Sequence, residues 1–103
     1  MTPDVDGRDL AERVRDAVRL VPGVVRLHPG LLGEVATHLP GRTVPGVRVR
    51  DQHVEVHVVV GEDTDIRAVA TQVRRAASAA AGVPAHVRVE DLAPATPPEL
   101  EIT

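Results

Sequence analysis

The fold of this 103-residue chain is decided by the segment Val47–Leu92, which reads VRVRDQHVEVHVVVGEDTDIRAVATQVRRAASAAAGVPAHVRVEDL. Two strands in which valine alternates with polar residues are followed by a helix with a clear start and end, and then by a third valine strand. No catalytic, metal-binding or phosphate-binding motif lies in this segment. It therefore predicts most of a fold and very little chemistry.

The first two strands are predicted to pair as a hairpin over Val47–Arg50 and His53–Val60, with Asp51-Gln52 at the turn. One face of the hairpin carries only valines, at positions 47, 49, 54, 56, 58 and 60. The opposite face is polar except for Val59. This alternation predicts one packed face and one wetter face.

The helix that follows is predicted to be capped by Asp63 or Thr64, with Asp65 in its first turn, and to end at Gly82. Its apolar stripe consists of Ile66, Val69, Ala70, Val73, Ala77 and Ala80. The last strand starts at Ala85, and a strand–helix–strand unit forms a right-handed crossover. We therefore expect this strand to lie parallel to the second strand of the hairpin.

Before this segment, residues 6–21 are predicted to be a helix with Asp6 as its N-cap, because apolar residues recur at helical spacing. Val24–His28 is predicted to be a short strand, and the alternation over Leu31–Leu39 marginally favours another. The tetrapeptide Val-Pro-Gly-Val precedes a predicted strand twice, at 21–24 and at 44–47, which indicates one turn used twice.

Together these elements predict one α+β domain over residues 1–92, followed by a proline-rich disordered tail over residues 93–103. The expected architecture is a two-layer sandwich with two helices packed on one face of a mixed sheet of four or five strands. Their order along the chain is α-β-(β)-β-β-α-β.

Composition narrows the function classes. Valine supplies 20 residues and alanine 13, Phe, Tyr and Trp are absent, and the net charge is −3. The chain therefore lacks the stacking side chains and the basic surplus that are typical of nucleic-acid binders. It has no cysteine, which excludes disulfides, thiolate nucleophiles and cysteine-ligated zinc. No segment is apolar over the length that spans a bilayer, so we expect a cytoplasmic protein.

Two local patterns resemble binding motifs. His53 and His57 have the spacing of a helical metal chelate, but on a strand they lie roughly 13 Å apart, too far for one ion. Gly30-Leu31-Leu32-Gly33 matches the GxxG of a KH domain in its glycines, but leucines stand where basic residues would be needed to clamp a nucleic-acid backbone. We predict no catalytic residue, metal or cofactor, and nucleic acid is an unfavoured partner.

The polar face of the sheet is what remains for function, because the valine face packs against the helices. Its mixture of charges suits a solvated surface and equally suits contact with another protein, including a second copy of the chain. The edge strands offer a second route to assembly. The predicted interaction face consists of Arg48, Arg50, Glu55, His57, Val59, His86, Arg88 and Glu90.

The order of these elements resembles the alkaline shock protein family of envelope stress response proteins. The resemblance covers roughly residues 8–92 and rests on an ordered set of short motifs, with segment 28–43 matching poorly. The motifs are Leu20-Val21-Pro22-Gly23-Val24, Pro45-Gly46-Val47-Arg48-Val49, Val54-Glu55-Val56-His57-Val58-Val59-Val60-Gly61, the helix Ile66–Ala81, and Gly82-Val83 through His86-Val87-Arg88-Val89.

The resemblance implies a non-enzymatic bacterial protein of the cytoplasm that takes part in cell-envelope stress and homeostasis. Family members are associated with self-assembly and with recruitment to the membrane by an anchored protein partner, and they have no established catalytic residues to transfer. The chain is shorter than many members, which have longer charged ends. The alternative is a small regulatory module that binds a metabolic enzyme or, less readily, RNA.

Overall fold

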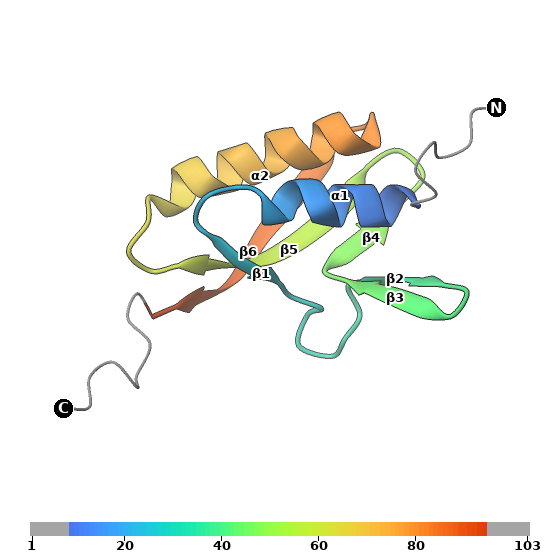
Figure 1. The fold of residues 1–103 in the computed structure, drawn as a ribbon, viewed down its shortest axis with the longest axis horizontal. Coiled ribbons are helices and arrows are strands. Elements are labelled where there is room, and N and C mark those ends of the chain that lie inside the picture. The colour runs from blue at the N-terminus through green and yellow to red at the C-terminus, as the bar shows by residue number, and fades with distance from the viewer. Residues whose placement is uncertain (1–8, 95–103) are drawn as a thin grey trace.

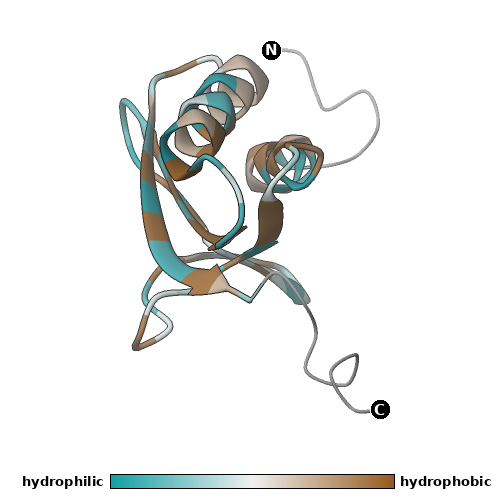
Figure 2. Cartoon of the chain, turned by 90° about the vertical axis from the view of Figure 1, so that its left-hand side faces the viewer, coloured by the Kyte–Doolittle hydropathy of each residue, from teal (hydrophilic) through white to brown (hydrophobic). Residues whose placement is uncertain are grey.

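Two helices cover one face of a mixed sheet in the computed structural model, which describes residues 9–94 (Figure 1). This arrangement confirms the predicted α+β sandwich. Figure 2 shows both helices on the same side of the sheet and the β1–β2 loop on the other. The elements are α1 (Leu10–Arg19), β1 (Val24–Leu27), β2 (Ala36–Leu39), β3 (Arg42–Pro45), β4 (Val47–Val49), β5 (Val54–Gly61), α2 (Ile66–Ala81) and β6 (Ala85–Ala93).

Strand β5 is the centre of the main sheet and uses both of its edges. The predicted hairpin is confirmed, because β4 pairs antiparallel with the first half of β5. Strand β1 pairs antiparallel with the second half, along the same edge. On the other edge β6 runs parallel to β5 over its whole length, as the crossover rule predicts. Strands β2 and β3 form a separate two-stranded sheet.

The core lies between the helices and the valine face of β5. Because side chains alternate along a strand, Val54, Val56, Val58 and Val60 all point at the helices and are fully buried. Full burial of one valine side chain stabilises a fold by about 1.5–3 kcal/mol. Val49 shares this face as predicted, because it pairs with Val54, but it lies at the end of β4 and is 40% exposed.

The structure corrects the N-caps of both helices. Asp9 caps α1 in a capping box with Glu12, so the helix starts later than predicted, and the predicted cap, Asp6, lies outside the described residues. For α2 the cap is Asp65, whose carboxylate accepts from the Ala68 N–H, in place of Asp63 or Thr64. Gly82 ends α2 in the left-handed conformation, as predicted.

The chain between β1 and β4 departs most from the prediction. Leu31–Leu39 was expected to be a strand, but only Ala36–Leu39 is one, and it forms a hairpin with β3 around Pro40-Gly41. Residues 28–35 form the loop at the bottom of Figure 1. At the other end, β6 continues to Ala93, one residue into the predicted tail, and residues 95–103 of that tail lie outside the described residues.

Candidate interaction face

The sheet face turned away from the helices brings most of the predicted interaction residues together. Strand register places Arg48, Glu55 and His86 in one row across β4, β5 and β6, and His57 beside Arg88 in another row. Because partners in a row share one face, these side chains are neighbours. We use the name polar face for Arg48, Glu55, His57, His86, Arg88 and Glu90.

Glu55 is the central acceptor of the polar face. Its Oε1 accepts from Arg48, with Nη2 at 2.6 Å, and its Oε2 lies 3.3 Å from His53 Nε2 and 3.6 Å from Arg50 Nε. Burial alone would raise the pKa of Glu55, but the hydrogen bonds from Arg48 and His53 outweigh it and lower the pKa. The carboxylate is therefore charged and draws three side chains toward β5.

Glu90 forms the second acidic centre. Its Oε2 lies 2.5 Å from His57 Nδ1 and 3.8 Å from Arg88 Nε. His57 and Glu90 are half-buried, whereas the Arg88 side chain is 72% exposed. Arg88 therefore presents its guanidinium to solvent, where a second molecule can reach it.

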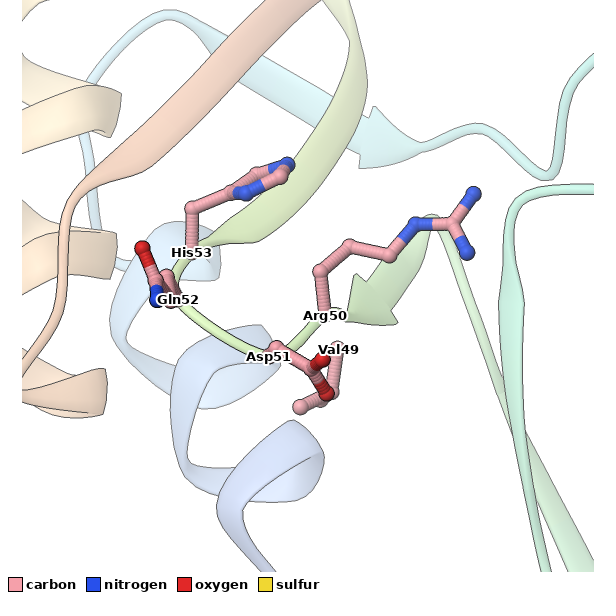
Figure 3. A pocket seen from close by; sticks show the side chains of 5 residues that line it. All are labelled: Val49, Arg50, Asp51, Gln52 and His53. Carbon is pink, nitrogen blue, oxygen red and sulfur yellow. The ribbon is translucent and has the colours of Figure 1, made fainter.

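Two histidine rings stack at the end of the polar face that is nearest the turn between β4 and β5. The ring centroids of His53 and His86 lie 4.2 Å apart, with an angle of 22° between the planes. Figure 3 shows His53 at the end of the hairpin turn and Arg50 reaching away from it, around a hollow lined by Val49–His53. Within residues 9–94, no three His, Asp or Glu side chains are grouped so that they could hold a metal ion.

Two predicted members lie outside the polar face. Arg50 follows the end of β4 and belongs to the turn, although its guanidinium still reaches Glu55. Val59 is only 1% exposed, so it cannot form part of an interaction surface, and its place in the predicted face is corrected. Alternation predicts which face of the strand Val59 lies on, but not whether other parts of the chain cover that position. The sequence therefore could not predict that Val59 is buried.

The sequence prediction missed two exposed leucines beside the polar face. Leu31 and Leu32, 88% and 92% exposed, form the tip of the β1–β2 loop, and we call this pair the leucine tip. A turn holds the tip, because the Gly33 N–H donates to the Gly30 carbonyl and the Leu32 N–H donates to Glu34 Oε1. The pattern Gly30-Leu31-Leu32-Gly33 could have predicted this exposure, because glycines on both sides indicate a tight turn and a tight turn cannot bury both leucine side chains.

The leucine tip is tied to the polar face. Arg48 Nη1 donates to the Glu34 carbonyl oxygen at 3.2 Å, which joins the loop to β4. The Glu34 carboxylate accepts hydrogen bonds from the backbone N–H groups of Glu34 and Leu32, and these bonds lower the pKa of Glu34. A hollow of about 410 Å³ lies between the tip and His57, Arg88 and Glu90. An apolar knob and a charged surface thus border the same depression.

An ion pair on the helix side, between the largely buried Glu12 and the half-exposed Arg42, was also missed by the sequence analysis. Arg42 of β3 donates to both carboxylate oxygens of Glu12 in α1, with Nε at 2.5 Å and Nη2 at 3.1 Å. Glu12 also accepts from the Asp9 N–H, and the hydrogen bond from Arg42, followed by that from Asp9, lowers its pKa to about 2. This pair fastens the β2–β3 hairpin to α1 and has a structural role.

Comparison with protein-family models, with curated proteins and with solved structures found no match to this chain. No helix within residues 9–94 has the length and apolar character needed to cross a membrane.

Proposed function

We propose that this chain is a non-enzymatic scaffold or interaction protein of the bacterial cell-envelope stress response, acting through self-association and protein partners. Its place of action is the cytoplasm, and any contact with the membrane runs through an anchored protein partner. The resemblance of its element order to the alkaline shock protein family supports this role.

The observation that carries the proposal is the leucine tip beside the exposed guanidinium of Arg88. Two leucines that are almost fully exposed cost free energy in water, and burial against another protein recovers about 1.5–3 kcal/mol per side chain. The neighbouring polar face carries both signs of charge, so that a second copy or a partner can meet it with complementary groups. The combination of apolar anchor and charged rim is typical of protein interfaces.

The test is capture from the native host with the wild-type chain and with two matched variants. The double variant Leu31→Ser/Leu32→Ser removes the leucine tip, whereas Leu20→Ser removes a leucine that is 82% exposed at the end of α1, away from the polar face. Because all three leucines are exposed, we expect the free energy of unfolding of each variant to lie within about 0.5 kcal/mol of the wild-type value.

We expect wild type and Leu20→Ser to retain envelope proteins and to self-associate in light scattering, and the double variant to lose both. Recovery of no envelope protein by wild type, together with a monomer at every concentration, would overturn the proposal. Equal capture by the double variant would show that the leucine tip is not the anchor.

A further inference from the structure

Within residues 9–94, the outer edge of β6 is an open strand edge. Strand β6 spans nine residues, longer than an average strand, and among the described residues it pairs only with β5. The Val54 N–H of β5 donates to the Pro84 carbonyl oxygen at 3.0 Å. Because backbone groups alternate along a strand, those of Ala85, Val87 and Val89 point away from β5. They form a row of donors and acceptors that a further strand could use.

A groove runs between this edge and α2. Figure 1 shows β6 passing beneath α2, and residues of both elements line a hollow of about 400 Å³. The helix lines it with one stripe at i, i+3, i+4 and i+7, namely Arg67, Ala70, Thr71 and Arg74. The strand contributes Ala85, His86 and Val87. The small side chains at 70 and 71 leave room for modest apolar groups, and half-buried Val87 forms a floor for them.

The charge around the groove is positive, although the whole chain carries −3. Arg67 and Arg74 are exposed, and neither has an ion-pair partner in the part of the chain that the structure describes. Arg88 stands on the opposite side of β6 with 72% of its side chain exposed. The acidic residues of β6 are Asp91 and Glu90, which is the extra residue of the bulge between Val89 and Asp91. The segment Ala85–Val89 therefore carries basic side chains and no acidic one.

We propose that Ala85–Val89 binds an extended acidic segment of a partner polypeptide as an added strand. Side chains of an added strand alternate between its two faces. One set, small and apolar, enters the groove under α2 and lies on Val87. The other set, acidic, lies beside Arg88, and acidic groups at the ends of the segment meet Arg67 and Arg74. This site shares Arg88 with the polar face, but it is argued from the edge of β6 and the groove beside α2 and does not rest on the proposed function.

The experiment titrates the full chain with a synthetic peptide in which glutamate and valine alternate over seven residues and one terminal tryptophan is added. Because the chain contains no Trp, Tyr or Phe, the fluorescence of the peptide reports binding without background. We expect saturable binding that weakens with salt, and weaker binding of a peptide with lysine in place of glutamate. We also expect slower hydrogen exchange at the Val87 and Val89 amides.

The matched variants are Arg74→Glu and Arg75→Glu, which change net charge equally at adjacent exposed positions of α2. Only Arg74 lines the groove, so we expect its reversal to weaken binding about tenfold or more and Arg75→Glu to change it little. Val87→Pro removes an outward N–H and should abolish binding while the chain still unfolds cooperatively, because proline is tolerated at strand edges.

Four outcomes would overturn the proposal. The first is that no binding is detected up to about 1 mM peptide, because a specific site would bind more tightly than that. The second is that the lysine peptide binds as tightly as the glutamate peptide, and the third is that Arg74→Glu and Arg75→Glu weaken binding equally. The fourth is that the peptide slows hydrogen exchange at the leucine tip and not at the edge of β6. A dimer in which the Val87 amide is protected without peptide would show that a second copy covers the edge instead.

Discussion

Replacing Gly46 with alanine should lower the free energy of unfolding more than the same replacement at any other glycine in a turn. Gly46 joins β3 to β4, where its N–H donates to the Val35 carbonyl and its own carbonyl accepts from the His57 N–H. It thereby links the β1–β2 loop to the central strand. Its φ is +85°, a left-handed conformation that favours glycine.

The magnitude follows from two effects that the structure separates. A left-handed backbone costs an alanine about 1–2 kcal/mol. A Cβ at Gly46 would also lie 2.5 Å from Leu27 Cβ and 3.0 Å from the His28 backbone nitrogen, so the backbone must shift, at a cost of about 1–3 kcal/mol. The sum, about 2–5 kcal/mol, is a large part of the roughly 5–15 kcal/mol that stabilises a domain.

Gly41→Ala is the matched control. Gly41 has φ +74° at the β2–β3 turn, and a Cβ there would meet no atom within 4 Å. Its replacement should cost only the conformational part, about 1–2 kcal/mol. Urea unfolding followed by far-ultraviolet circular dichroism measures both variants, since the chain has no aromatic residue for a fluorescence assay. Equal losses of unfolding free energy in the two variants would refute the argument from close packing.

The acid sensitivity of the fold should depend on Glu12. Its pKa falls from 4.5 to about 2 on folding, so the stability it contributes is complete above pH 4.5 and is lost as the pH falls toward 2. Glu12→Gln should weaken the dependence of the urea midpoint on pH between pH 4.5 and pH 2. A dependence as steep as that of wild type in this variant would contradict this account. Val56→Ala should cost about 2–3 kcal/mol in urea unfolding, because two buried methyl groups and the space they filled are lost. Val49→Ala, at a position 40% exposed, should cost less than about 1 kcal/mol, and similar losses in both would argue against the assigned core face.

Sequence patterns were most informative where a local rule acts alone. Helix α2 begins at Ile66 and ends at Ala81, within the predicted limits, because its apolar stripe and Gly82 are local signals. The β4–β5 hairpin was predicted for the same reason, and the parallel pairing of β6 followed from the crossover rule. The cap of α2 was wrong by one or two residues, because Asp63, Thr64 and Asp65 are all competent caps and only the backbone path selects among them.

The candidate interaction face was predicted in part. Alternation placed Arg48, Glu55 and His57 on one face, and strand register aligned Glu55 and His57 with residues of β6. Alternation could not tell that Val59 would be buried or that the leucine tip would stand beside His57. These outcomes depend on contacts between residues far apart in the chain, on which periodicity carries no information.

By itself the sequence determined the local elements and the two faces of the central strand, because helix and strand periods are properties of consecutive residues. Only the tertiary structure decided that β1 and β4 share one edge of β5, and that no strand within residues 9–94 pairs with the far edge of β6. It also decided that Arg42 meets Glu12 and that the β1–β2 loop lies over the polar face. Such choices are made by packing and hydrogen bonding between distant segments, where many pairings satisfy the same local pattern and only one buries the valine core.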